Sequence, residues 1–203
     1  MTYGAKIYND SGDVVIDDEG INYLLTSSGT LTGSVYQYNN ALYEYSTATY
    51  PQITFPAFVK LNVGEFVGVG GAAGGLISSQ SSLEVLSLKP AKDIADPTGY
   101  DVVFYDASGN KTWIASSSIV VLNSSATISA FGSVSSDADY VAVLTALPYF
   151  QPTGNPQIFN SVLQGVERTS STTYSWAGRG VGAAPPVSGI GPYPVACLFA
   201  KSN

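Results

Sequence analysis

Few side chains in this sequence could perform chemistry, because it contains no histidine and a single cysteine, Cys197. A Ser-His-Asp triad, a zinc site of His and Cys, a haem and an iron–sulfur cluster all need residues that are absent or too few. The composition still allows catalysis by paired carboxylates or by lysine and tyrosine. One cysteine forms no disulfide within the chain, and we expect Cys197 to be a small buried apolar residue.

The densest group of acidic residues lies near the N-terminus. Its members are Asp10, Asp13, Asp17, Asp18 and Glu19. Calcium would require about six to eight oxygen ligands in a loop with glycine at a defined position, and the spacing here does not fit that pattern. We therefore interpret the group as a hairpin turn and a solvated strand end, and we predict no metal site.

A second acidic pair, Asp137 and Asp139, flanks Ala138. Two carboxylates that project from one face of a strand could act as the acid pair of a glycosidase. No third chemical group lies nearby in the sequence, so a solvated loop is the favoured interpretation. We predict no catalytic residue, and a glycan depolymerase is the weakest functional alternative.

A glycine-rich stretch contains Gly68, Gly70, Gly71, Gly74 and Gly75. A dinucleotide fingerprint needs a following helix, and a phosphate-binding P-loop needs Gly-Lys-Ser/Thr, and neither pattern is present. We expect a flexible loop, or a place where backbones pack closely across a subunit contact. No cofactor is predicted.

Tyrosine is abundant, with 14 residues in the chain, and four of them are the first candidates for contact with a partner or receptor. If residues 39–42 form a four-residue loop, Tyr38 faces Tyr43 and Tyr36 faces Tyr45 on one side of a hairpin. Such an aromatic face suits a sugar ring or a protein partner. A packed or self-associating sheet surface is the alternative.

Residues 178–194 are rich in glycine and proline and contain the other two candidate contact residues, Arg179 and Tyr193. Proline lacks the amide donor of a central strand, so we expect a long extended loop that reaches another subunit or stays disordered. The apolar run 195–200 predicts that the chain then returns as a final strand.

Apolar residues at alternate positions, as in Tyr100, Val102 and Phe104, are typical of β-strands, and turn residues recur every 8 to 12 residues. The sequence predicts an all-β protein of antiparallel β-sandwich or jelly-roll-like modules joined by Gly/Pro-rich loops. One short helical turn is possible at 160–168, where a strand is nearly as well supported.

An internal repeat at an offset of 97 residues indicates duplication, with 8 identities in the 30 positions from residue 3 to residue 32. The identities pair Tyr3, Tyr8, Ser11, Gly12, Leu25, Ser27, Ser28 and Thr30 with Tyr100, Tyr105, Ser108, Gly109, Leu122, Ser124, Ser125 and Thr127. A Pro-containing, charged linker at 89–98 lies between the copies. We predict two internally similar modules in tandem, 1–92 and 98–203.

Each copy opens with a predicted hairpin whose turn has Asn or Asp at its entrance and Gly12 or Gly109 where positive φ is needed. The pattern Tyr3-Gly4-x-x-Ile7-Tyr8-Asn9-x-Ser11-Gly12, repeated from Tyr100, resembles small uncharacterised proteins encoded among the tail genes of phages and prophages. The second copy departs from it, with Asp101 after the tyrosine. The resemblance covers roughly 60 residues and implies a virion structural role without carrying over catalytic residues.

The charge balance limits the partners. A net charge of −7, with 8 scattered basic residues, argues against nucleic acid. No basic leader precedes an apolar run, and no apolar stretch reaches the roughly 20 residues of a membrane span. A β-protein with so few charges has few ways to protect its strand edges, which favours a fixed homo-oligomer.

These observations lead to one functional expectation. The chain is predicted to be a non-enzymatic bacteriophage virion protein of the tail region, a fibre or tip component synthesised in the host cytoplasm. Its expected partners are further copies of itself, in a trimer by analogy with fibres, other virion proteins, and a glycan or protein of the host surface. A capsid decoration protein is the alternative.

Overall fold

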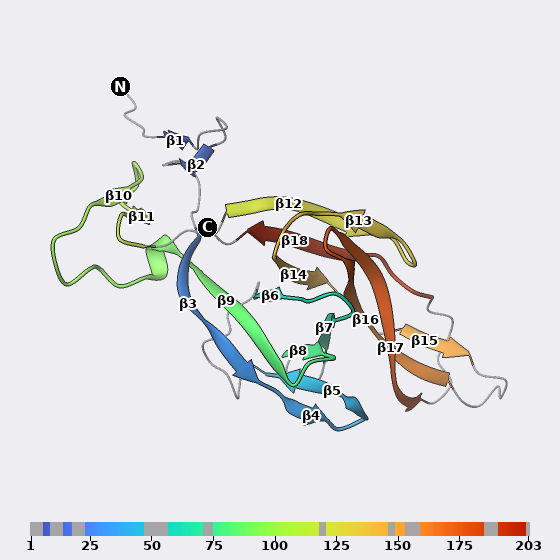
Figure 1. Cartoon of the computed structure of the whole chain (residues 1–203). Helices are drawn as coiled ribbons and strands as arrows, with labels where there is room; N and C mark the ends of the chain where they lie inside the picture. The colour runs from blue at the N-terminus through green and yellow to red at the C-terminus, as the bar shows by residue number, and fades with distance from the viewer. Residues whose placement is uncertain are drawn as a thin grey trace.

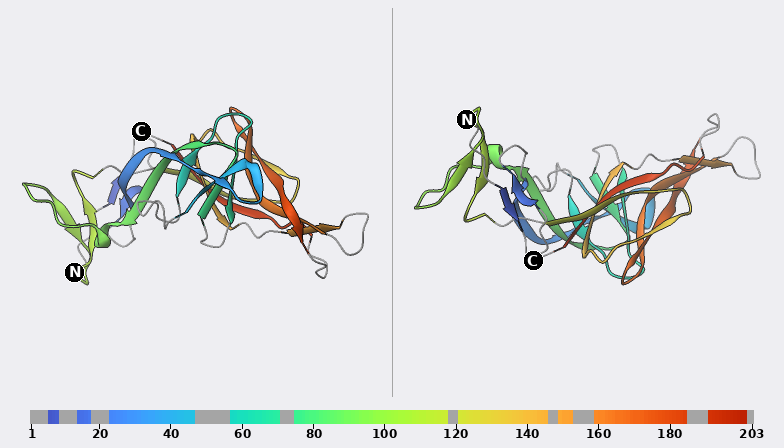
Figure 2. Two further views of the ribbon diagram at one scale, coloured as in Figure 1. Left: turned by 90° about the horizontal axis from the view of Figure 1, so that it is seen from below. Right: turned by 90° about the horizontal axis from the view of Figure 1, so that it is seen from above.

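The computed structural model describes most of the chain. The described residues are 6–8, 14–17, 23–46, 57–70, 75–117, 121–145, 149–152, 159–184 and 191–201. They form antiparallel strands and one short 3-10 helix, so the prediction of an all-β fold is confirmed. Figures 1 and 2 show an elongated molecule in which two large sheets form the body.

The first large sheet has six strands. Their order is β12 (Val121–Ile128), β18 (Val195–Lys201), β14 (Tyr140–Thr145), β6 (Phe58–Lys60), β9 (Ser82–Pro90) and β3 (Tyr23–Thr32). The final strand predicted at 195–200 is therefore confirmed, as β18, and it lies between two other strands. Cys197 on this strand is buried and free, as expected.

The second large sheet has eight strands. Seven follow the order β13 (Ser133–Ser135), β17 (Thr173–Ala184), β16 (Phe159–Ser170), β7 (Phe66–Gly70), β8 (Gly75–Ser78), β5 (Asn39–Tyr45) and β4 (Ser34–Tyr36). The eighth, β15 (Tyr149–Pro152), pairs with β16 beside β7.

Two small hairpins stand apart from the large sheets, β1 (Lys6–Tyr8) with β2 (Val14–Asp17) and β10 (Val103–Tyr105) with β11 (Lys111–Ile114). At an offset of 97 residues the two hairpins have the same register and the same bulge before their tyrosine. The β3–β9 and β12–β18 pairs also carry their bulges at positions 97 residues apart.

The two halves of the chain share both sheets. The halves join where β6 pairs with β14 in the first sheet and where β7 pairs with β16 in the second. Outward from this join, the first sheet continues through β9 and β3 on one side and through β18 and β12 on the other. The second sheet continues through β8 and β5 on one side and through β17 and β13 on the other. The β3–β9 and β12–β18 pairs, whose bulges match at the offset of 97 residues, thus lie at opposite ends of the first sheet. The expectation of modules in tandem needs this refinement, while the boundaries 1–92 and 98–203 stay a prediction.

The main core lies between the two sheets and draws on both halves. Val59, Val85 and Phe199 from the first sheet pack with Val67 and Tyr174 from the second. Outer faces are also buried in places, around Phe58 on the six-stranded sheet and around Phe66 on the eight-stranded sheet. Both faces of the central strands are therefore apolar.

The segment between the halves is held against the body. It contains the 3-10 helix η1 (Ala91–Asp93), and Ala91 is buried with Leu24 and Ile114. The Lys111 ammonium donates to the carbonyl of Ile94 at 2.5 Å and forms an ion pair with Asp96. The linker composition read from the sequence thus corresponds to a segment with specific contacts.

Two local predictions are wrong. Residues 160–168 belong to strand β16, since both faces of this strand bury apolar side chains and its pattern imitates a helix. Residues 178–184 continue strand β17 instead of starting a loop.

The described part of the chain contains no apolar helix of membrane-spanning length.

The join between β7 and β16 depends on glycine. Gly68 faces Gly165, and a Cβ on Gly165 would lie 2.1 Å from the Val67 carbonyl oxygen. The glycine-rich stretch around Gly68 thus marks a close backbone approach, which here lies within one chain. Glycine is the one residue that permits this approach.

We predict that Gly165→Ala lowers the free energy of unfolding by about 1–3 kcal/mol, because the clash is with backbone atoms that cannot rotate away. Equilibrium unfolding in urea measures the change. Gly29→Ala is the matched control, since a Cβ on Gly29 in β3 meets nothing within 4 Å. Equal stability of the two variants would contradict the close-packed join.

Candidate binding groove

Strands β15, β16 and β17 extend beyond the sandwich at one end of the molecule, opposite the β10–β11 hairpin (Figure 2). Tyr149 on β15 pairs with Val162 on β16, and Gln151 pairs with Asn160. Because side chains alternate along a strand, these four residues point to the same face of the three-stranded extension.

That face is hollowed into a groove of about 420 Å³. The lining consists of Tyr149, Gln151, Asn160, Val162, Gly178, Gly180 and Gly182. The three glycines occupy alternate positions of β17, so the strand offers no side chain on the groove side. Space beside Gly180 is open, because a Cβ there would meet nothing within 4 Å.

The groove carries amides and no lining charge. The side chains of Gln151 and Asn160 are exposed, and neither takes part in a hydrogen bond among the described residues. Each amide can donate two hydrogen bonds and accept others through its oxygen. The pair is therefore suited to a ligand that both donates and accepts hydrogen bonds.

Aromatic rings continue from one side of the groove. The Trp176 ring on β17 lies 6.1 Å from the Tyr149 ring and 4.7 Å from the Phe131 ring, measured between centroids. A Cβ on Gly178 would touch Trp176, which places the indole directly beside the groove. Burial raises the pKa of Tyr149 above its usual value, so its hydroxyl stays protonated at neutral pH.

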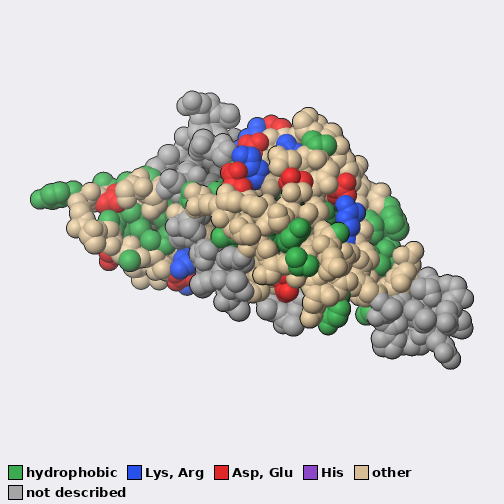
Figure 3. All heavy atoms as spheres, turned by 60° about the horizontal axis from the view of Figure 1, so that its bottom comes forward, with side chains coloured by type: hydrophobic (Ala, Val, Ile, Leu, Met, Phe, Trp, Pro, Cys, Tyr) green, Lys and Arg blue, Asp and Glu red, His purple; other side chains and the backbone are tan. Residues whose placement is uncertain are grey.

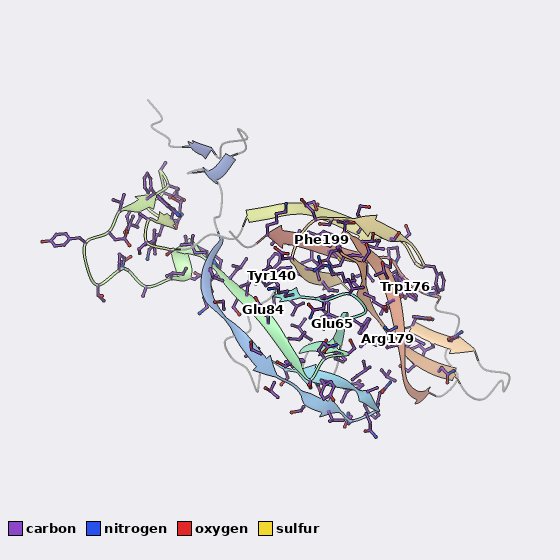
Figure 4. All side chains as sticks on the ribbon, in the orientation of Figure 1. Glu65, Glu84, Tyr140, Trp176, Arg179 and Phe199 are labelled. Atoms are coloured by element: carbon purple, nitrogen blue, oxygen red, sulfur yellow. The ribbon has the colours of Figure 1, made fainter. Side chains whose placement is uncertain are left out.

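Hydrogen bonds fix the position of the indole. Its Nε1 donates to the Tyr193 carbonyl at 3.0 Å, and the Tyr193 N–H donates to Oε1 of Gln164 at 2.7 Å. Gln164 is fully buried in β16. Tyr193 thus supports the groove through its main chain. Figure 4 shows Trp176 on β17 near the extension.

Phe131 has an unusual conformation for a bulky residue. Its φ is 62°, and its side chain is 76% exposed. The residue lies in a turn in which the Gly132 N–H donates to the Ser129 carbonyl at 2.8 Å. A left-handed conformation costs a non-glycine residue about 1–2 kcal/mol, and such strain is concentrated at functional positions.

Arg179 lies between Gly178 and Gly180 and points to the opposite face of β17. Its guanidinium pairs with the Glu167 carboxylate at 2.5 Å and lies 5.0 Å from the centre of the Phe66 ring. These contacts hold Arg179 beside the cluster around Phe66 on the outer face of the eight-stranded sheet, and it does not line the groove.

The four tyrosines of the predicted aromatic face are divided between two faces. The turn is at residues 37–38, so Tyr36 pairs with Asn39 and Tyr43 with Val35, and the predicted pairing is wrong. Tyr45 is buried in the main core, and its hydroxyl donates to the Gln80 carbonyl. Tyr36 lies on the outer face of the eight-stranded sheet, in the cluster around Phe66, beside exposed Tyr38. Contact of any of them with a partner stays a prediction.

The acidic pair Asp137 and Asp139 lies just before strand β14. Asp137 forms an ion pair with Lys201, and Asp139 lies near the start of β14. Apart from the Asp17 backbone, the N-terminal acidic group lies outside the described residues. Within the ranges described, no three His, Cys, Asp or Glu side chains gather as a metal site would require.

One carboxylate has a strong local partner. Tyr140 donates a short hydrogen bond to Glu84, and Lys60 pairs with the same carboxylate at 3.2 Å. Figure 4 labels Tyr140 and Glu84, which lie near one another. The hydrogen bond lowers the pKa of Glu84, with a further contribution from Lys60. Burial and the neighbouring carboxylate raise the pKa of Tyr140.

Sequence reasoning did not single out Tyr149, Trp176, Phe131 or the two amides. The available signal was the alternation of Gly178, Gly180 and Gly182, which is compatible with a strand that lacks side chains on one face. No protein-family model, curated protein or solved structure matches the chain. The groove is therefore interpreted from its own geometry.

We predict that Tyr140→Phe reduces the loss of stability in acid. A lowered folded-state pKa of Glu84 contributes stability above its ordinary value of 4.5, and that stability disappears as pH falls through the lowered pKa. The Glu84 side chain is 43% exposed. Solvent screening therefore limits the effect to under about 1 kcal/mol. Urea unfolding near neutral pH and at about pH 3 measures it.

The matched control is Tyr149→Phe, because burial alone raises the pKa of Tyr149. This variant should keep the acid dependence of the wild type. An unchanged acid dependence in Tyr140→Phe would show that the hydrogen bond does not influence the titration of Glu84.

Proposed function

We propose that the chain is a non-enzymatic structural and adhesive protein of a bacteriophage virion, located in the tail region as a fibre or tip component. The repeated tyrosine-containing strand and Ser-Gly turn support the virion assignment through their resemblance to proteins encoded among tail genes. A rigid double-sheet body with a groove at one end supports an adhesive role.

The observation that carries the oligomeric part of the proposal is the composition of the edge strands. Among the described strands, β3 and β12 end one sheet and β4 and β13 end the other, and none of the four contains a charged residue. Charged side chains, especially lysine, are the usual protection of an exposed edge. Edges without them are suited to pairing with, or being covered by, another copy.

The end of the molecule near β10 offers further contact area. Tyr100, Val102 and Tyr105 are exposed there. Figure 3 shows hydrophobic side chains along this end, whereas charged side chains of opposite sign stand close together on the body. One end is thus suited to apolar assembly contacts, and the other end carries the groove.

Electron microscopy of particles labelled with an antibody to this chain tests the proposed place in the virion. We expect label at the tail, and quantitative mass spectrometry should give a few to a few tens of copies per particle. Label over the capsid with hundreds of copies would instead identify a decoration protein. Particles free of the chain would contradict the virion assignment.

We predict that Thr30→Lys and Thr127→Lys dissociate the proposed homo-oligomer, because each places a charge on an exposed position of an edge strand. Light scattering after size exclusion measures the mass in solution. Thr172→Lys is the control, since Thr172 is exposed in the turn between β16 and β17. A monomeric wild type, or edge variants with the wild-type mass, would contradict edge-mediated assembly.

A further inference from the structure

We propose that the groove binds a neutral oligosaccharide, with sugar hydroxyls at Gln151 and Asn160 and sugar rings against the aromatic row formed by Tyr149, Trp176 and Phe131. The inference deepens the adhesive role and rests on that proposed function for its biological purpose. The groove itself belongs to a single chain, so binding is measured without a virion.

The shape of the groove fits a saccharide unit. Its volume of about 420 Å³ lies within the usual range for small-molecule sites, about 300–1,000 Å³. The open positions at Gly180 and Gly182 leave the groove accessible from solvent along β17. A chain of sugar units could therefore enter without a change in the backbone.

The hydrogen-bonding groups fit hydroxyls. Gln151 and Asn160 are cross-strand neighbours, so their Cβ atoms lie about 5 Å apart. Their side chains therefore face the same ligand. A sugar hydroxyl both donates and accepts, as an amide does. Two adjacent amides can hold two hydroxyls of one ring.

The charge distribution selects a neutral ligand. None of the seven lining residues is charged. Arg179, the charged residue of β17, projects from the other face and is paired with Glu167. An anionic sugar would lose hydration in the groove and find no compensating cation among the lining residues.

The aromatic row gives a reason for the strained backbone conformation of Phe131. A strained backbone and a largely exposed ring are both unfavourable at Phe131 in the isolated chain, and glycine at this position would relieve the strain. The ring packs against Trp176 and extends the apolar surface outward from the groove. The C–H groups of a pyranose face can pack on such rings, which makes the exposed phenyl useful once a ligand is bound.

Tryptophan fluorescence of the full chain tests the inference. The sequence has two tryptophans, so Trp113→Phe leaves Trp176 as the single reporter and keeps an aromatic ring against Phe104. The probes are neutral hexasaccharides of glucose, galactose, mannose and N-acetylglucosamine, and an anionic hexasaccharide of galacturonate. We expect at least one neutral probe to give a saturable change, and the galacturonate probe to bind at least about tenfold more weakly.

Two variants locate the site in the same Trp113→Phe background. Gly180→Val fills the groove and Phe131→Gly removes the exposed ring, and each should weaken binding at least about tenfold. Gly29→Val is the matched control, because it adds the same side chain at another open strand position. Urea unfolding shows that all three variants remain folded.

The inference is overturned if none of the neutral probes binds, if galacturonate binds as tightly as they do, or if the two groove variants bind like the control. These results leave the proposed virion role intact, because that role is tested by the position of the chain in the particle. Conversely, saccharide binding by a chain that is absent from virions would overturn the virion role alone.

Discussion

The fold depends on the edge-to-edge pairing of its two halves. β6 pairs with β14 in one sheet and β7 with β16 in the other, and the main core lies between these pairs. Half a chain alone would leave those strand edges and one side of the core uncovered. The second pairing requires the close approach of Gly68 and Gly165, so the absence of a side chain at two positions sets the geometry of the whole body.

The same pairing positions the groove. Strand β16 joins β7 through residues 165–167 and carries groove residues Asn160 and Val162 nearer its start. Between these segments, Gln164 is fully buried and accepts a hydrogen bond from the main chain of Tyr193, whose carbonyl holds the Trp176 indole. The join, the indole and the groove are therefore linked through strand β16, and Tyr193, which lies outside the strands, connects this strand to the indole.

Much of the fold could be predicted because hairpin turns and alternating apolar residues are local signals. The pattern at 160–168 was misleading, because Val162 and Leu163 face opposite sides and both are buried. The tyrosine register was missed for a non-local reason. Asn39, expected in the loop, opens β5 and donates to the Gly180 carbonyl at 2.7 Å, a contact 141 residues away. The groove was not predicted, because β17 lines it with three glycines that present no side chain, and the other lining residues come from β15 and β16.

Scarce charge has a structural consequence for how such a chain can assemble. Its ion pairs, such as Lys60 with Glu84 and Arg179 with Glu167, lie within one molecule and stabilise local positions. Among the described strands, those at the ends of the two sheets have only uncharged side chains, so partner copies would meet through main-chain hydrogen bonds and apolar contacts. Contacts of this kind are weakly screened by salt, unlike ion pairs at a surface. The proposed assembly edges and the proposed saccharide groove therefore have one property in common, because neither uses the charged side chains that form ion pairs elsewhere in the chain.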